Sequence, residues 1–263
     1  MDYFDVHSHI QEKEFDADRD EVLVRMKEAH IGAFVIGTDI ESSRRAVALA
    51  RSHDNLYAII GQHPTDRARE TFVEEEYEKL LDEKVVGIGE CGLDYFRLKG
   101  DFETEKTRQV ALFKKQIEFA LTHNLPLMLH CRPTRNSVDA YRDVLEILEG
   151  YKKEYEEKLR GDVHFFVGNR EVAGRFVALN FTLSFTGVIT FASEYDAVVR
   201  ETPLTHILSE TDCPFVAPVP YRSLRNEPLF VKEIVGRIAH LRDEDEEGVK
   251  KALLANVRRV FAL

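Results

Sequence analysis

The sequence predicts a single (β/α)₈ barrel, also called a TIM barrel, that spans residues 1–263. Apolar runs of strand length alternate along the chain with segments of helical periodicity, and this alternation repeats eight times. Most of these runs end on a residue that can bind a metal ion or a phosphate. In a (β/α)₈ barrel the carboxyl ends of all the strands meet at one face, so these residues would lie together. They are His7, His9, His63, Glu90, His130, His164 and Asp212.

The expected elements follow from the periodicity of the apolar residues. We expect strands at residues 3–6, 33–37, 56–61, 85–89, 127–129, 162–163, 182–186 and 206–209. We expect helices at residues 18–29, 41–52, 70–82, 103–123, 137–159, 170–178, 193–201, 226–241 and 245–259. Asp18 and Glu21 have the spacing of a capping box for the first helix.

Composition is consistent with one large domain in a reducing compartment. The 263 residues are 44% hydrophobic, which is enough for the core of one barrel. No apolar run approaches the roughly 18 residues that span a bilayer, and the first residues lack the basic and apolar segments of a signal peptide. Cys91, Cys131 and Cys213 are widely spaced and odd in number, which argues against disulfides. We therefore expect a cytoplasmic protein with no membrane association and no obligate protein partner.

Each cysteine is adjacent to a candidate polar residue of a strand end. Strand alternation then turns the thiols away from the site and towards the helices. We interpret Cys91, Cys131 and Cys213 as small buried apolar residues rather than as metal ligands.

The first strand ends in a pair of histidines, in the segment Asp5-Val6-His7-Ser8-His9. Alternation along a strand directs both imidazoles to the same side. Imidazoles and carboxylates together can hold Zn²⁺, Mn²⁺, Mg²⁺ or Ni²⁺, so the ligand types do not select one metal. Two neighbouring histidines also occur in proteins without any metal, and the metal hypothesis therefore depends on the ligands at the later strand ends.

Other residues at the strand ends are candidates for substrate binding. His63, Tyr95, Arg132 and Arg222 are placed where phosphate oxygens would arrive, and an arginine can bind a phosphate with two hydrogen bonds. Each of them could equally form a salt bridge or a hydrogen bond at the rim of the barrel. We expect Asp94 to orient a metal ligand or to contact the substrate.

Several motifs in this order resemble those of the TatD-like metal-dependent deoxyribonucleases, which belong to the amidohydrolase superfamily of TIM barrels. They are Asp5-Val6-His7-Ser8-His9, Gly61-Gln62-His63-Pro64, Gly89-Glu90-Cys91-Gly92-Leu93-Asp94-Tyr95, Leu129-His130-Cys131-Arg132, His164 and Glu210-Thr211-Asp212-Cys213-Pro214. The resemblance implies hydrolysis of phosphodiester bonds in DNA with one to three divalent cations. It also implies two ligand sets that share Glu90: His7, His9, Glu90 and Asp212 for one ion, and Glu90, His130 and His164 for a second.

The chemistry fits these residue types. Two cations about 3.5–4 Å apart that share a carboxylate can polarise a phosphoryl oxygen and generate hydroxide near neutral pH. Glu90 suits the shared position. Asp212 suits the role of general base, because a carboxylate beside the bound water can orient it and take its proton.

The chain departs from the family pattern at three places, none of which removes a metal ligand. Phe165-Phe166-Val167-Gly168 stands where the family usually has Cys-Phe-Ser-Gly, Tyr221 stands where histidine is common, and Pro133-Thr134 stands where an acidic residue and alanine are usual. These departures concern the choice of substrate.

The net charge of −11, from 36 basic and 47 acidic residues, is the opposite of the basic surface of most duplex-binding proteins. We therefore expect an exonuclease that acts on single-stranded DNA, on 3′ ends or on frayed ends. An amidohydrolase-type enzyme that cleaves an ester or amide, such as a D-aminoacyl-tRNA deacylase, is the alternative. A non-catalytic metal-binding scaffold is less well supported, because all six candidate ligands are present.

Overall fold

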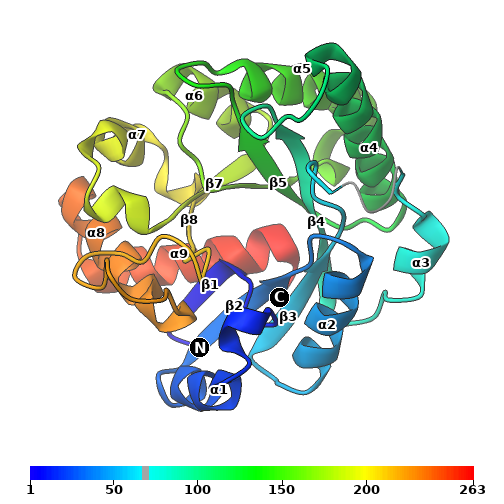
Figure 1. Ribbon diagram of the computed structural model, residues 1–263. Helices are drawn as coiled ribbons and strands as arrows, with labels where there is room; N and C mark the ends of the chain where they lie inside the picture. Colours follow the sequence, from blue (N-terminus) through cyan, green and yellow to red (C-terminus); the bar gives the residue numbers. More distant parts are fainter. Residues whose placement is uncertain (67–70) are drawn as a thin grey trace.

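The computed structural model describes residues 1–66 and 71–263 and confirms the predicted (β/α)₈ barrel (Figure 1). Eight parallel strands pair in sequence order from β1 to β8. After β8 the chain returns to β1: the His9 amide donates to the Cys213 carbonyl at 2.9 Å, and the Asp212 amide donates to the His7 carbonyl at 2.9 Å. The strands are β1 (Tyr3–Ser8), β2 (Ile31–Ile36), β3 (Leu56–Ile60), β4 (Val85–Asp94), β5 (Leu127–Arg132), β6 (Gly161–His164), β7 (Phe181–Phe185) and β8 (Ile207–Ser209).

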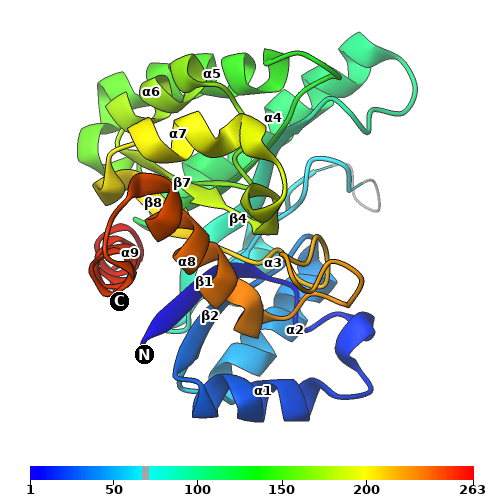
Figure 2. The ribbon, with the colours of Figure 1, turned by 90° about the vertical axis from the view of Figure 1, so that its left-hand side faces the viewer.

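The helices form a layer outside the strands (Figure 1). They are α1 (Arg19–Glu28), α2 (Ile40–Arg51), α3 (Glu74–Glu78), α4 (Phe102–Thr122), α5 (Asp139–Tyr155), α6 (Arg170–Ala178), α7 (Asp196–Glu201), α8 (Val231–Arg242) and α9 (Glu246–Phe261). In Figure 2 the helix α9 lies at the left, at the end of the barrel where β1 begins, and the long loops that follow the strands lie at the right.

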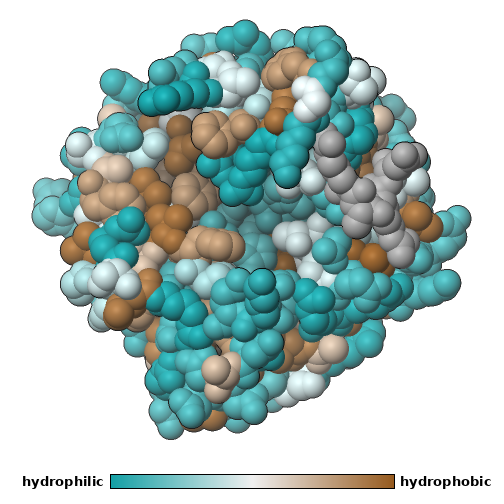
Figure 3. Space-filling model, in the orientation of Figure 1, coloured by the Kyte–Doolittle hydropathy of each residue, from teal (hydrophilic) through white to brown (hydrophobic). Residues whose placement is uncertain are grey.

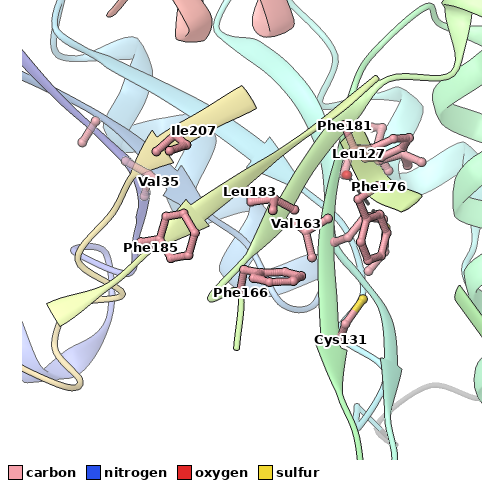
Figure 4. Close-up of a cluster of buried hydrophobic side chains, with 14 of the residues drawn as sticks. Val35, Leu127, Cys131, Val163, Phe166, Phe176, Phe181, Leu183, Phe185 and Ile207 are labelled. Atoms are coloured by element: carbon pink, nitrogen blue, oxygen red, sulfur yellow. Dashed lines mark hydrogen bonds between the residues drawn. The ribbon is translucent and has the colours of Figure 1, made fainter. Parts of the chain in front are cut away.

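Two groups of buried side chains fill the molecule on either side of the strands. The larger group lies between the strands and the helices and includes Val163, Phe176, Phe181 and Leu183 (Figure 4). The second group consists of residues from β1 to β5 and β8, which meet inside the barrel, and of residues from α9. Its members include Phe4, Phe34, Ile59, Met128, Leu208, Val257, Val260 and Phe261.

The three cysteines lie in hydrophobic surroundings, as predicted. Cys91, Cys131 and Cys213 are free and buried, and all three belong to the larger hydrophobic group. Figure 4 shows Cys131 among the side chains that face the helices. Burial raises the pKa of each thiol above its usual value, which keeps it protonated.

Four of the expected helices are shorter than the periodicity suggested. The expected helices 137–159 and 193–201 are found as α5 (Asp139–Tyr155) and α7 (Asp196–Glu201). Residue 70, the first of the expected helix 70–82, lies outside the described residues, and α3 itself covers only Glu74–Glu78 with Tyr77 as its single buried residue. The expected helix 226–241 begins only at Val231. Asn226 is instead buried in a loop, where its amide donates to the carbonyls of Thr211 and Phe215 at 2.7 and 2.6 Å.

The predicted capping box at the start of α1 is wrong. Asp18 precedes the helix but makes no capping hydrogen bond. Its two carboxylate oxygens accept hydrogen bonds from Arg225, each at 2.7 Å. A charge-assisted bidentate pair is stronger than a single bond to a backbone amide, so the long-range partner displaces the local one.

Across residues 1–66 and 71–263, we find no helix with both the length and the hydrophobicity needed to cross a lipid bilayer.

Candidate metal centre

Glu90 lies at the centre of the candidate site, inside the barrel. Its Oε2 atom is 3.5 Å from His7 Nε2 and 3.9 Å from His9 Nε2. Its Oε1 atom is 2.5 Å from His130 Nδ1 and 3.7 Å from His164 Nε2. Each oxygen of one buried carboxylate therefore faces a different pair of histidines. This is the arrangement that a carboxylate shared between two cations requires.

An irregularity in β4 directs Glu90 into the barrel. The strand was expected to end before Glu90 but continues to Asp94, and its register with β5 shifts between Ile88 and Cys91. Such local shifts are common beside active sites, because they re-aim a side chain without ending the strand.

The first side of the site is formed by the ends of β1 and β8. His7 Nε2 and His9 Nε2 are 3.2 Å apart, and Asp212 Oδ1 lies 3.9 and 3.5 Å from them. His9 Nδ1 lies 3.1 Å from the Ile36 carbonyl. That carbonyl can only accept a hydrogen bond, so Nδ1 carries the proton and the Nε2 lone pair points into the site.

The second side is formed by the ends of β3, β5 and β6. His63 Nε2 lies 3.6 Å from Glu90 Oε1, so His63 joins His130 around this oxygen. The ring of His164 stacks on that of His7, with centroids 3.4 Å apart, and thereby connects the two sides. The structure thus brings together all six residues that the resemblance implied as metal ligands: His7, His9, Glu90, His130, His164 and Asp212.

The grouping on this side differs from the ligand set implied by the resemblance. His164 forms a group with His7 and Glu210, although its Nε2 atom also faces Glu90 Oε1 at 3.7 Å, and His63 joins His130 and Glu90. His63 is a donor in this position. The Thr65 amide donates to its Nδ1 at 3.1 Å, so the proton of the neutral ring is on Nε2, which faces the site. Burial and the neighbouring His130 lower the pKa of His63 to about 3, and the ring is therefore neutral near pH 7.

Buried carboxylates outside the central group orient the histidines. Asp94 Oδ2 lies 3.1 Å from His130 Nε2, on the side of the ring opposite Glu90. Its other oxygen accepts the Arg97 amide at 2.8 Å. Asp94 is fully buried and does not line the pocket, which supports the orienting role over the substrate contact.

Glu210 is a second buried carboxylate beside a histidine, and it was assigned no role in the sequence. Its Oε1 atom lies 3.0 Å from His164 Nδ1 and accepts the Phe165 amide at 2.7 Å. Its position directly after β8 and two residues before Asp212 is the signal that could have revealed it.

Asp162 holds a proton beneath this carboxylate. Ser184 Oγ lies 2.6 Å from Asp162 Oδ2 and 2.7 Å from Glu210 Oε2. A hydroxyl has one proton and can donate to only one of the two, so the other must itself be protonated. Burial and the nearby Glu210 raise the pKa of Asp162 to about 8, which identifies it as the protonated acid near pH 7.

The donor set fits divalent cations. The Nε2 atoms of His7 and His9, 3.2 Å apart, match the separation of about 3.4 Å between two ligand atoms of a tetrahedral zinc with bonds near 2.0–2.1 Å.

Two buried ring nitrogens also lack partners. His7 Nδ1 and His164 Nδ1 have no hydrogen-bond partner within the described part of the chain. The 3.0 Å approach of Glu210 to His164 is too poorly aligned to count as a hydrogen bond. Burial without partners is costly for these atoms unless a cation or a solvent molecule satisfies them.

A pocket of about 790 Å³ opens above these residues at the carboxyl ends of the strands. Figure 3 shows the hollow, with hydrophilic residues inside it and hydrophobic residues along its left border. Two arginines line the pocket, Arg132 as predicted and Arg97, which was missed. Arg97 belongs to a loop after β4 that carries no motif, and nothing in its local sequence distinguished it.

Two of the predicted substrate contacts lie away from this pocket. Tyr95 is 4% exposed and donates its hydroxyl to Asp143 at 2.7 Å, so it packs among the helices. Arg222 is exposed at the rim, where it donates to the Ala217 carbonyl at 2.7 Å and lies over the ring of Phe191. Neither residue lines the pocket. Direct contact with the substrate is not supported for the buried Tyr95, and for Arg222 at the rim it stays a prediction.

Comparison with known proteins identifies the family. The sequence profile described as TatD related DNase matches residues 4–262. The chain belongs to the TatD-related DNase family. As a member of this family it is a metal-dependent hydrolase, in agreement with the donor set described above.

Individual relatives match the chain over nearly their whole length. It is 38% identical to the uncharacterized metal-dependent hydrolase YabD of Bacillus subtilis, with 99% of each protein covered. It is 32% identical to the 3′-5′ ssDNA/RNA exonuclease TatD of Escherichia coli K12, again with 99% of each covered. Its structure is similar to the crystal structure of the TatD homologue YjjV of Escherichia coli K12, with a TM-score of 0.87, 28% identity and coverage of 100% and 98% of the two chains.

Proposed function

We propose that this member of the TatD family is a divalent-metal-dependent exonuclease that hydrolyses phosphodiester bonds at the ends of single-stranded DNA, including 3′ ends. The observation that carries the proposal is the position of Glu90, which presents one oxygen to His7 and His9 and the other to His130 and His164. Cations held by these residues and Asp212 would polarise the phosphate and activate a water molecule.

Asp212 is the proposed general base. It lines the pocket, and its Oδ1 lies 3.5 Å from His9 Nε2. Burial raises the pKa of Asp212, but the adjacent imidazoles of His9, His164 and His7 lower it further, below the usual value. The carboxylate is therefore ionised near pH 7 and can accept a proton from water.

Neutral and cationic donors are available for the phosphate. The Nε2–H group of His63 faces the site, because the Thr65 amide donates to Nδ1 of the same ring. Arg132 and Arg97 line the same pocket and can donate charge-assisted hydrogen bonds to phosphate oxygens. These few groups would hold a strand end without the extended basic surface that a duplex requires. The relative named 3′-5′ ssDNA/RNA exonuclease supports the same substrate class.

Release of nucleotides from end-labelled strands tests the proposal. We expect the purified protein to shorten a 5′-labelled single strand stepwise from its 3′ end, to act much more slowly on a blunt duplex, and to lose this activity with a chelator. Elemental analysis of the same preparation should find one to three divalent ions per chain. Hydrolysis of D-aminoacyl-tRNA without any release of nucleotides would instead favour the deacylase, and a protein with no metal and no hydrolysis would favour the scaffold.

A further inference from the structure

The exposed phenylalanines of this protein gather at one end of the barrel. Within residues 1–66 and 71–263, four phenylalanines are more than a third exposed: Phe96 at 55%, Phe102 at 38%, Phe191 at 46% and Phe215 at 56%. Phe96 and Phe102 follow β4, Phe191 follows β7, and Phe215 follows β8. All four therefore lie beyond the carboxyl ends of strands, on the side where the pocket opens. Exposed aromatic rings at the end of the molecule where a pocket opens are candidates for a binding surface, because their hydration is unfavourable.

Two of these rings are paired with arginines. The guanidinium carbon of Arg132 lies 4.5 Å from the centroid of the Phe96 ring, and that of Arg222 lies 4.0 Å from the centroid of the Phe191 ring. Neither arginine forms an ion pair within the described parts of the chain, in contrast to Arg225, which binds Asp18 and Glu227. Each pair therefore offers an aromatic face together with an uncommitted positive charge.

Phe215 and a fifth phenylalanine, Phe165, lie beside histidines of the candidate metal centre. Phe215 lines the pocket, and its ring centroid is 6.4 Å from that of His9. Phe165 also lines the pocket, 5.8 Å from His164, and has a φ angle of +49°. This left-handed conformation is unfavourable for a bulky residue. It is maintained because the Phe165 amide donates to the buried Glu210, and strained residues that are fixed in this way cluster at functional sites.

The rim of the pocket is divided by charge. After β1, β2 and β3 the lining residues include Glu12, Asp39 and Asp66. After β4 to β8 they include Arg97, Arg132, Phe165 and Phe215. Glu12 is paired with Arg45 at 2.7 Å, so the main effect is attraction of a polyanion to the second part, where two arginines line the pocket.

We propose that the rim after β4 to β8 is a binding surface for unpaired nucleobases of a single-stranded nucleic acid. The bases stack on Phe96, Phe165 and Phe215, with Phe191 further out, while Arg132 and Arg222 contact the backbone phosphates. Aromatic rings bind every base through its face, so this surface tolerates any sequence but requires that the bases be unpaired. The proposal rests on the proposed function, since it explains how the strand reaches the metal centre.

Binding of two strands that differ only in their bases tests the surface. One is a fluorescent oligothymidylate, and the other is an abasic oligomer of the same length with tetrahydrofuran in place of each nucleoside. Both carry phosphorothioate linkages, which slow hydrolysis, and both are titrated onto the purified protein with its native metal. We expect the wild type to bind the oligothymidylate at least about tenfold more tightly, because stacking contributes with each base.

Substitutions localise the effect. Phe215→Ala and Phe96→Ala should each weaken oligothymidylate binding about tenfold and change abasic binding less than twofold, whereas Phe215→Tyr and Phe96→Tyr should retain affinity. Phe102→Ala is the matched control, because Phe102 is the least exposed of the four phenylalanines and its ring packs against that of Tyr95, with centroids 5.5 Å apart. It should bind both oligomers as the wild type does.

Equal affinity of the wild type for the two oligomers would overturn the proposal. The proposal would also be overturned if Phe215→Ala weakened binding of the oligothymidylate and of the abasic oligomer to the same extent. Hydrolysis of unmodified strands is measured in parallel to separate this test from the proposed function. Cleavage without any preference for bases would reject the stacking surface and keep the exonuclease. Preference for bases without cleavage of any strand would reject the exonuclease and keep the surface.

Discussion

The two ends of the barrel interior are built from opposite kinds of residue. At the amino end, Phe4, Phe34 and Met128 meet inside the strands, and Phe261 of α9 closes this end. At the carboxyl end the strands and the loops that follow them present imidazoles and carboxylates. They are His7, His9, His63, Glu90, His130, His164, Glu210 and Asp212, all of which are mostly or fully buried.

This difference separates the source of stability from the source of activity. Burial of apolar side chains at the amino end contributes favourably to the free energy of folding. Burial of ionisable groups at the carboxyl end is unfavourable unless each group is paired. The amino end and the outer core therefore stabilise a site that would not assemble by itself, and substitutions at the two ends should have separable effects.

The largest effect is expected for Glu90→Gln. A neutral amide cannot balance two cations, so we expect metal content to fall and hydrolysis to decrease by at least roughly 1000-fold. Elemental analysis and single-turnover hydrolysis measure the two effects, and circular dichroism should show an unchanged fold. Full activity of this variant would show that Glu90 is not shared between cations.

At the amino end, Phe34→Ala should reduce stability instead. Phe34 is fully buried between Phe4 and Phe261, with ring centroids 4.7 and 4.5 Å away. Removal of a buried phenylalanine costs about 3–5 kcal/mol. Denaturant titration measures the free energy of unfolding, and the protein that remains folded should keep its metal and its specific activity. Metal loss from the folded variant would contradict the separation of the two ends.

A smaller effect is expected for Asp94→Asn, which keeps the shape of the side chain but removes its charge. Loss of a carboxylate that orients a metal-binding histidine weakens metal affinity about 10- to 100-fold. Competition with a chromogenic chelator measures this affinity directly. Asp143→Asn is the control, because Asp143 binds Tyr95 and Lys106 outside the barrel and should leave metal affinity unchanged.

The smallest effects should come from the rim. Arg132→Ala should lower kcat/KM for DNA by about one order of magnitude with metal content unchanged, the scale of a lost charge-assisted hydrogen bond. Arg222→Ala should have a weaker effect in the same direction, because Arg222 lies outside the pocket lining.

The affinity for single-stranded DNA should depend only weakly on salt concentration, since few phosphates are contacted. A steep dependence would indicate a binding surface elsewhere.

Much of the site could be predicted because its residues occur at the same place in successive repeats, directly at the end of a predicted strand. Each strand of the barrel is an apolar run, and the polar residue at its end stands out from that run. His7, Glu90, His130, His164 and Asp212 were all found by this contrast. The cysteines were assigned correctly by the same alternation, because their neighbours face the opposite side of the strand.

The sequence by itself determined the alternation of strands and helices, and with it the barrel and the end of the barrel where the site lies. Only the tertiary structure decided which groups meet there. Asp18 binds Arg225 across 207 positions of sequence instead of capping its own helix. Tyr95 turns outward to Asp143, and Glu210 lies under His164. Local periodicity specifies the side of a strand that a residue occupies, but hydrogen bonds between distant segments depend on three-dimensional packing that no short window of sequence contains.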